Sequence, residues 1–261
     1  MREDLANQLL PQHGEAIDPV AMARRDQQKA LPRRFYEVAS AEPVEGGFTV
    51  ALDGKPARTP GRNPITVSNK ALADALAAEW HAQSEFIDPS NMPLTRMVNS
   101  AIDGVAREME LVRAEVTKYA GSDMLCYRAG DPQALVNEQA QMWDPLLTWA
   151  HEELGARFIC AEGIIFADQP QAAVDAVRRA VDAIQSPFAL AGLHVMTTIT
   201  GSVVLALAVA RGRLTAAEAW AAAHLDEDFQ MRAWGEDAEA LARRARRWID
   251  MDAAARLYQL A

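Results

Sequence analysis

The chain is poor in cysteine. Cys126 and Cys160 are its two cysteines, and they lie far apart in the sequence and form no C-x-x-C pair. A disulfide framework and a zinc ribbon both need more cysteines at closer spacing, so neither is expected. This cysteine usage fits a reducing compartment best.

Positive charge is also in short supply. The 261 residues include 26 lysines and arginines against 36 aspartates and glutamates, giving a formal net charge of -10. A general nucleic-acid binder needs a basic surface to displace counterions from phosphates, so this composition argues against one. Residues 1–19 lack the apolar segment of a secretory signal and the arginine-rich character of a transit peptide. A cytoplasmic location is expected, with residues 1–30 as a loosely ordered tail.

One uncharged apolar stretch, residues 195–210, has the composition of a membrane segment. Sixteen helical residues span about 24 Å, whereas the hydrocarbon core of a bilayer is about 30 Å thick. We therefore expect a buried central helix and no membrane insertion. A peripheral membrane protein that uses this stretch remains a weaker alternative.

The usual catalytic motifs are missing as well. No G-x-G-x-x-G opens a helix after a strand, and no G-x-S-x-G presents a serine. Gly54-Lys55 is not part of a phosphate-binding loop, because Thr49 stands where the first glycine is needed. His151 begins HEELG, which lacks the second histidine of the H-E-x-x-H zinc motif. No cofactor and no metal are expected.

Two histidines leave an enzymatic alternative open. His194 lies among apolar residues, where a displaced pKa would suit an acid or base, although a core histidine with a satisfied hydrogen bond is the simpler interpretation. His224 precedes Asp226, Glu227 and Asp228, but this spacing matches no specific metal-ligand pattern. The alternative function is a small-molecule enzyme with an acid/base site around His194 or the Glu227/Asp228 cluster.

Hydrophobic periodicity predicts an α+β fold, in which a small N-terminal antiparallel β domain precedes a larger, mostly α-helical domain. Strands are expected at residues 35–39, 47–53 and 65–67, and Asp53-Gly54 is a hairpin turn signal. Two short runs within residues 157–166 suggest a minor hairpin. The predicted organisation is a tail (1–30), an N-terminal domain with a helix (31–110) and a C-terminal helical domain (111–261).

Helical spacing begins after Ser68, a predicted N-cap, where Leu72, Leu76 and Trp80 recur. Further helices are expected at residues 94–120, from Asp131-Pro132 with a kink or restart at Asp144-Pro145, at 170–184, at 187–212, from the capping box Thr215-x-x-Glu218 to Gly235, and from there to Leu260.

The segment from Leu225 to Trp248 has the most unusual composition. Six carboxylates surround Phe229 and Trp234, and four arginines follow them: Asp226, Glu227, Asp228, Glu236, Asp237 and Glu239, then Arg243, Arg244, Arg246 and Arg247. Acidic groups that flank an aromatic can form a recognition surface for a basic or adenine-like partner, although solvated helix faces are the simpler interpretation. Trp234 is expected at the surface, and most other tryptophans in the core.

Eight ordered segments resemble the family of assembly chaperones for the alpha subunit of F-type ATP synthase (catalytic-head assembly factor 2). They are RRFYEV (33–38), LDGKPARTPGRNP (52–64), AEW (78–80), IDPSNMPLTRMVNSAID (87–103), DMLCYRA (123–129), WDPLLTWA (143–150), TGSVVLALA (200–208) and LDEDFQMRAWGEDAEA (225–240). The resemblance covers residues 31–258. Any one of these segments alone would be weak evidence for the family, whereas eight in the same order are specific.

The resemblance implies a non-enzymatic protein that binds the unassembled alpha subunit and prevents its aggregation until the beta subunit replaces it. The family occurs in mitochondria and alphaproteobacteria. Because the N-terminal tail shows no organelle-targeting character, we expect a bacterial cytoplasmic protein whose eukaryotic relatives lie in the mitochondrial matrix. The free chaperone is expected to be a monomer.

Acidic residues of the C-terminal domain are implicated in function within the family, and residues 225–237 match that region. We expect Glu227 and Asp228 to contact basic residues of the client, Phe229 and Trp234 to act as apolar anchors, and Glu236 to be a rim charge.

A second candidate surface consists of basic residues that would meet acidic client groups: Arg33, Arg34, Lys55 and Arg58. The alternative is that this region is a hairpin that defines the fold, with a turn that requires Asp-Gly.

Overall fold

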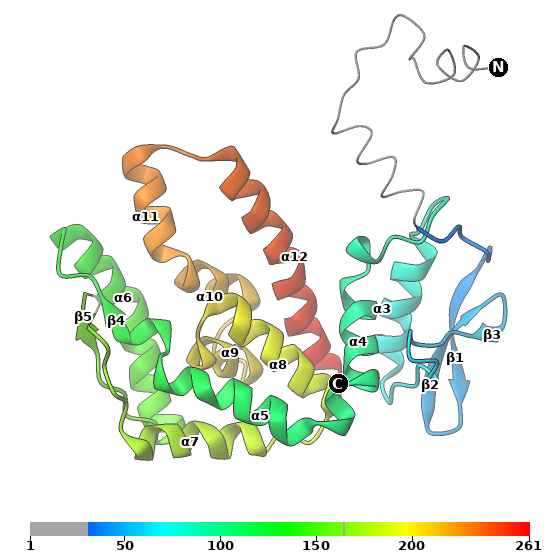
Figure 1. The fold of residues 1–261 in the computed structure, drawn as a ribbon, viewed down its shortest axis with the longest axis horizontal. Helices are drawn as coiled ribbons and strands as arrows, with labels where there is room; N and C mark the ends of the chain where they lie inside the picture. Colours follow the sequence, from blue (N-terminus) through cyan, green and yellow to red (C-terminus); the bar gives the residue numbers. More distant parts are fainter. Residues whose placement is uncertain (1–30, 164) are drawn as a thin grey trace, which may run out of the picture. The chain divides into compact units, whose positions relative to one another are not determined.

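The computed structural model describes residues 31–163 and 165–261 (Figure 1). The described residues divide into two compact units, one formed by residues 31–35 and 83–88 and the other by residues 36–82 and 89–261. The larger unit holds an antiparallel sheet followed by a mostly helical region, so the predicted α+β class is confirmed. The expected tail lies outside the described residues, and a boundary near residue 110 stays a prediction.

The smaller unit is a pairing of two short extended segments. Arg34 N donates to Glu85 O at 2.9 Å, and Ile87 N donates to Pro32 O at 2.9 Å. The Arg33 guanidinium lies 5.8 Å from the centre of the Phe86 ring. Backbone pairing therefore fixes this unit, with the arginine lying on an aromatic face.

The sheet has the order β1-β2-β3 and is antiparallel throughout. Its strands are β1 (Ala39–Val44), β2 (Gly47–Leu52) and β3 (Lys55–Pro56). The first strand was expected at residues 35–39 and instead begins where that run ends. The reason is a side chain: Asp53 accepts hydrogen bonds from Glu37 N at 3.1 Å and Val38 N at 2.8 Å, which holds this segment beside the turn.

The turn between β2 and β3 is the predicted Asp-Gly turn. Asp53 and Gly54 both have positive φ, 48° and 75°, which only such residues adopt at low cost. The strand expected at residues 65–67 is reduced to an isolated bridge, in which Val67 N donates to Phe48 O at 2.9 Å. Helix α3 (Lys70–His81) packs on β1 and β2, and Asn69 caps it in place of the predicted Ser68.

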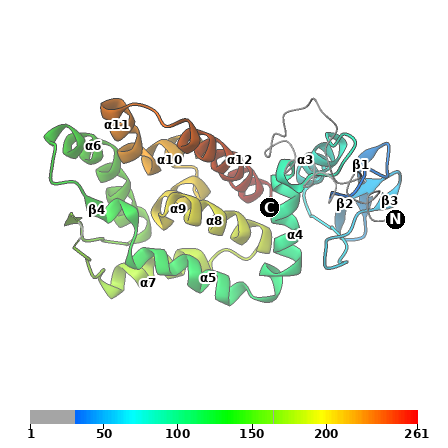
Figure 2. The same ribbon diagram turned by 45° about the horizontal axis from the view of Figure 1, so that its top comes forward.

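The helical region is built around α8 and α9, against which the neighbouring helices pack (Figure 2). Residues Val203 to Val209 of α9 are all buried, which explains the uncharged apolar stretch in the sequence. The helices of this region are α4 (Pro93–Asp103), α5 (Met109–Lys118), α6 (Gln133–Trp149), α7 (Gln171–Asp182), α8 (Pro187–Thr200), α9 (Val203–Ala210), α10 (Ala216–Ala223), α11 (Leu225–Trp234) and α12 (Ala238–Leu260). Within the described residues, no helix is long and apolar enough to cross a membrane.

Three predicted helices are interrupted. The helix expected at 94–120 breaks at Gly104 into α4 and α5, and the one expected at 187–212 breaks at Gly201, whose φ of 69° is left-handed. The helix expected from the Thr215 capping box, which is present, ends at His224 before α11 begins. By contrast, α6 runs through Pro145 without restarting and ends in a π-helical turn, Ala150–Leu154.

The minor hairpin expected within residues 157–166 is wrong for the residues described. Strand β5 (Ala161–Glu162) pairs in parallel with β4 (Tyr127–Arg128), a segment far away in the sequence. Residue 164, within the expected hairpin, lies outside the described residues. Local alternation of apolar residues cannot reveal a partner so distant along the chain.

Candidate functional site

Helix α11 carries the candidate acidic residues and is fastened to α6. Asp226 accepts a hydrogen bond from Gln139 Nε2 at 2.8 Å, and Arg232 forms an ion pair with Glu138. Both partners lie on α6, so the helix is held at both of its ends. These contacts give α11 a fixed position from which its remaining side chains can project.

A second fastening joins α11 to α12. Arg244 donates both terminal nitrogens to the Asp228 carboxylate, with Nη2 at 3.1 Å from Oδ2. The hydrogen bond to Asp228 raises the pKa of the Arg244 guanidinium. Only 19% of the Arg244 side chain and 34% of the Asp228 side chain are exposed. Asp228 is thus occupied by a bidentate contact within the protein.

Two arginines of α12, Arg244 and Arg247, bond to other elements, whereas Arg243 bonds within its own helix. Besides the Arg244 contact, Arg247 Nη2 donates to Ile199 O at 2.7 Å, and Arg243 donates to Glu239 at 2.6 Å. Arg244 thus bonds to the acidic cluster itself. The sequence signal for this contact is the change from acidic residues, which end at Glu239, to arginines, which begin at Arg243.

The other candidate residues of α11 are more accessible. The Glu227 side chain is 63% exposed, Trp234 is 89% exposed, and Glu236 is exposed. The surface position predicted for Trp234 is confirmed. Phe229 is half-buried, with the Arg232 guanidinium 5.4 Å from its ring centre. Gly235 ends α11 with a φ of 94°, so Trp234 stands at the tip of the helix.

A groove of about 520 Å³ lies between α11 and the first half of α12. Its walls combine apolar side chains with charges of both signs; they include Glu227, Met231 and Trp234 from α11 and Leu241, Arg243 and Arg247 from α12. We call this groove, together with Trp234 and Glu227, the α11 surface. Such a mixture suits a protein segment with an apolar side chain and nearby charges.

His224 at the base of the groove is a packing residue. It is buried, its ring centre lies 3.9 Å from that of Trp220, and its Nδ1 lies 2.8 Å from Trp220 O. Burial lowers the pKa of His224, so the ring is neutral at neutral pH. Its 4.0 Å distance to Glu227 is therefore no ion pair there. Within residues 31–163 and 165–261, no three histidine, cysteine or acidic side chains are placed to hold a metal ion.

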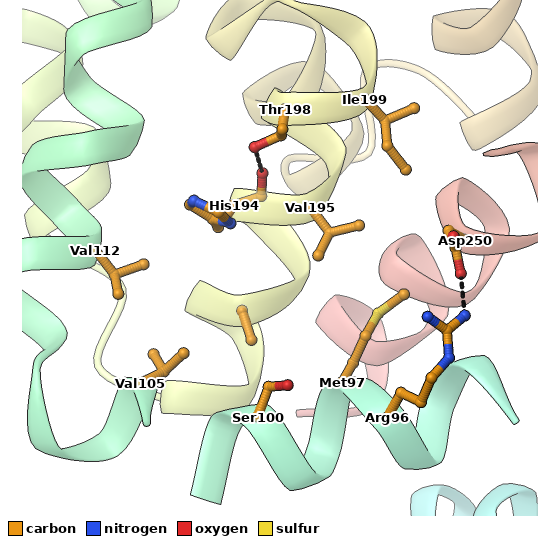
Figure 3. A pocket seen from close by; sticks show the side chains of 11 residues that line it. Arg96, Met97, Ser100, Val105, Val112, His194, Val195, Thr198, Ile199 and Asp250 are labelled. Atoms are coloured by element: carbon orange, nitrogen blue, oxygen red, sulfur yellow. Dashed lines mark hydrogen bonds and ion pairs between the residues drawn. The ribbon is translucent and has the colours of Figure 1, made fainter. Parts of the chain in front are cut away.

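His194 lies in a different place, a pocket of about 510 Å³ between α4, α5, α8 and α12 (Figure 3). Its walls are mainly apolar, and an ion pair of 2.6 Å between Arg96 and Asp250 borders them. The His194 ring points towards α5, and burial lowers its pKa.

The expectation of a core histidine with a satisfied hydrogen bond is wrong. The ring is partly exposed in the pocket, and in the described part of the chain it has no hydrogen-bond partner. A general acid or base is normally oriented by a second polar group, and within the described residues no polar group is hydrogen-bonded to this ring. The His194 pocket contains neither Glu227 nor Asp228. The two candidate acid/base sites of the enzymatic alternative are therefore in separate places.

The second candidate surface is divided between the two units. Arg33 lies 3.4 Å from Glu85 in the smaller unit, where Arg34 also bonds to the Gln83 carbonyl. Lys55 and Arg58 belong to the larger unit, in which Arg58 Nη1 donates to the Arg62 carbonyl at 2.9 Å.

The proline-rich loop that carries Lys55 and Arg58 depends on one carboxylate that sequence reasoning missed. Asp103, the last residue of α4, accepts hydrogen bonds from Thr59 Oγ1 at 2.6 Å, Asn63 Nδ2 at 2.7 Å and Gly61 N at 2.9 Å. These hydrogen bonds lower the pKa of Asp103, and the one from Thr59 has the largest effect. The motif therefore has a structural role in fixing this loop to α4.

Comparisons with known proteins now decide the family. Residues 33–151 match the family model described as ATP12 chaperone protein. The crystal structure of Atp12 from Paracoccus denitrificans is 44% identical, with a TM-score of 0.82 over 88% of this chain and 98% of that chain. The chain belongs to the ATP12 chaperone family.

A further relative of known structure is the Atu1473 protein from Agrobacterium tumefaciens, described as a candidate chaperone. It is 51% identical, with a TM-score of 0.86 over 94% of this chain and 92% of that chain. The relatives of this ATP12 chaperone family member are thus named as chaperones and not as enzymes. The α11 surface lies beyond the residues matched by the family model, so its residues rest on the geometry given above.

Sequence reasoning also missed three exposed large apolar side chains in the segment between α6 and α7. Ile159, Ile165 and Phe166 are 51%, 71% and 66% exposed. The alternating pattern of this segment instead predicts a hairpin, in which part of these side chains would be covered.

Proposed function

We propose that this ATP12 chaperone family member acts in the assembly of ATP synthase, where it binds the unassembled alpha subunit and keeps it from aggregating until the beta subunit takes its place. Family membership and the likeness to Atp12 from Paracoccus denitrificans support an assembly role. The observation that carries the binding surface is Trp234, 89% exposed at the tip of a helix that is fastened at both ends.

The physical case for Trp234 is one of burial. A tryptophan buries about 150–250 Å² when it is covered, and aromatic side chains are typical anchors of protein interfaces. An isolated subunit of a hetero-oligomer exposes an apolar interface of its own, and a binder that covers it suppresses self-association by mass action. Truncation of an anchor of this kind costs about 2–4 kcal/mol of binding free energy.

Charge supplies specificity on the same surface. Glu227 projects from α11 with 63% of its side chain exposed, while Asp228 is engaged with Arg244. We propose that Glu227 contacts a basic group of the client directly, with Phe229 and Glu236 at its margin. Asp228 acts on binding through the position of α11. A rim contact of this type affects the association rate and its salt dependence more than the affinity.

We further propose that the protein works in the bacterial cytoplasm as a monomer and without enzymatic turnover. Arg33, Arg34, Lys55 and Arg58 remain proposed as secondary contacts to acidic client groups. The loop that carries Lys55 and Arg58 also has a structural role, because its residues donate hydrogen bonds to Asp103.

The test is co-expression with a tagged alpha subunit, followed by affinity purification and sizing. Wild type should elute with the alpha subunit, whereas Trp234→Ala should reduce the co-purified amount strongly. Glu227→Lys should reduce it as well, because it replaces an attractive contact by repulsion between like charges. The matched controls are Leu111→Ala, which removes another exposed apolar side chain, and Glu152→Lys, which reverses another exposed acid. Both controls should bind as wild type does.

Two outcomes contradict the proposal at different levels. If wild type forms no complex with the alpha subunit, the proposed client is wrong. If wild type binds but both α11 variants bind equally well while keeping their circular dichroism and melting temperature, the client is right and the surface is wrong.

A further inference from the structure

Strands β4 and β5 place the two cysteines of the chain next to each other. In this parallel pair Tyr127 is opposite Ala161, and Arg128 is opposite Glu162. The residues that immediately precede the first of these pairs are Cys126 and Cys160. Neighbouring strands lie about 4.8 Å apart, and disulfides join residues whose Cα atoms are about 4.4–6.8 Å apart. The backbone positions of the two cysteines therefore suit a disulfide.

The segment before β5 is held in place near this pair. Ile159 N donates to Gln169 Oε1 at 2.9 Å, and Gln169 Nε2 donates back to Ile159 O at 2.8 Å. After the strand, Gly163 N donates to Arg128 O at 2.9 Å. Hydrogen bonds on both sides of Cys160 thus fix its position relative to the strand that follows Cys126.

The two thiols differ in their access to solvent. Cys126 is fully buried, whereas Cys160 is exposed, and both are free thiols in the structure. Burial raises the pKa of the Cys126 thiol, and the nearby Cys160 thiol raises it further. A reagent from solvent meets Cys160 first, while Cys126 stands behind it as a neighbour of low reactivity.

We propose that Cys126 and Cys160 form a reversible disulfide, with Cys160 as the site that a hydroperoxide oxidises. In the first step the Cys160 thiolate attacks one oxygen of hydrogen peroxide, the O–O bond breaks, and Cys160 sulfenic acid and hydroxide are formed. In the second step the Cys126 thiolate attacks the sulfenic sulfur, the S–S bond forms, and the hydroxyl leaves as water after it takes up the proton of Cys126.

In total, two thiols lose two electrons and two protons, and one peroxide becomes two waters. Intracellular disulfides are commonly transient and redox-sensing, so such a bond is compatible with a reducing compartment. The bond would link the two ends of the segment that contains α6, whose Gln139 and Glu138 hold α11. The oxidised protein should therefore unfold at a higher urea concentration than the reduced protein.

The experiment treats the full-length chain with hydrogen peroxide and then counts free thiols after denaturation. Wild type should lose both thiols together, its intact mass should fall by two hydrogen atoms, and a protease digest should contain one peptide pair linked through Cys126 and Cys160. Dithiothreitol should restore both thiols. Because Cys126 must ionise to close the bond, closure should become faster as the pH rises.

Two variants separate the steps. In Cys126→Ala, Cys160 should stop at the sulfenic acid and be trapped by dimedone; in Cys160→Ser, the buried Cys126 should keep its thiol. The proposal is overturned if folded wild type loses only one thiol, gains oxygen on Cys160 without the linked peptide, or forms only disulfides between chains. The wild-type result decides by itself if a variant does not fold.

Discussion

Replacing Asp123 by asparagine should change how the free energy of unfolding depends on pH. The Asp123 carboxylate is fully buried between the segment before β4 and the start of α9. It accepts hydrogen bonds from Ser202 Oγ at 2.9 Å, Val204 N at 3.0 Å and Leu125 N at 3.1 Å. Asparagine keeps the shape of the side chain and removes its ionisation.

The magnitude follows from the environment of this carboxylate. Burial raises the pKa of Asp123 from 3.8 to about 6, although the hydrogen bonds act in the opposite direction. Each pKa unit corresponds to about 1.4 kcal/mol, so the shift corresponds to roughly 3 kcal/mol. A raised pKa means that the folded state binds the proton more tightly than the unfolded state. This stabilisation is complete below about pH 4 and is lost as the pH rises through about 6.

The assay is urea unfolding of wild type and Asp123→Asn at a series of pH values from about 4 to about 7. Every other titrating group is common to both proteins, so the difference in unfolding free energy isolates Asp123. The wild-type value minus the variant value should fall by roughly 2–3 kcal/mol across this range.

The reasoning is refuted if the difference between wild type and Asp123→Asn is constant from about pH 4 to about pH 7, or if it grows as the pH rises. A constant difference would mean that the carboxylate has an ordinary pKa in spite of its burial. A growing difference would mean that the hydrogen bonds to its charged form outweigh desolvation.

Three further substitutions test the packing that positions the site. Glu79→Ala removes the carboxylate that accepts hydrogen bonds from two backbone N–H groups at the start of α4, each at 2.8 Å. It should lower the unfolding free energy by about 1–2 kcal/mol in urea melts. An unchanged unfolding free energy would contradict this capping role. Gly192→Ala would place a Cβ 2.7 Å from the Ala254 carbonyl oxygen, so α8 and α12 must separate. We expect the unfolding free energy, measured by calorimetry, to fall by about 1–3 kcal/mol. An unchanged melting temperature would contradict the close approach of the two helices. A double-mutant cycle with Asp228→Ala and Arg244→Ala should give a coupling energy of about 1 kcal/mol, and additive effects would show that the bidentate pair does not join α11 to α12.

Local chemistry in the sequence predicts much of this fold. The Asp53-Gly54 turn, the Thr215 capping box and the break at Gly235 all follow from the conformations that these residues prefer, and all three are present. The exposure of Trp234 was also predictable, because a tryptophan among charges and before a glycine has little apolar surface to pack against.

Features that depend on partners distant in the sequence were not predictable in this way. The first strand begins later than predicted because the Asp53 carboxylate accepts hydrogen bonds from the backbone of Glu37 and Val38. Strand β5 pairs with the distant β4 and not with the adjacent residues of the expected hairpin. The same holds within the site, where periodicity places Asp228 on a helix but does not show that Arg244 of another helix binds it. Side-chain hydrogen bonds and nonlocal strand pairing leave no periodic trace in a single sequence.

The central proposal is that this chain keeps the isolated alpha subunit of ATP synthase soluble through the α11 surface. Light scattering of purified alpha subunit during dilution from denaturant measures this directly, with the chain added at equal concentration. Wild type and Leu111→Ala should suppress the scattering to the same extent, and Trp234→Ala should suppress it much less. Equal aggregation with and without the wild-type chain would contradict the account.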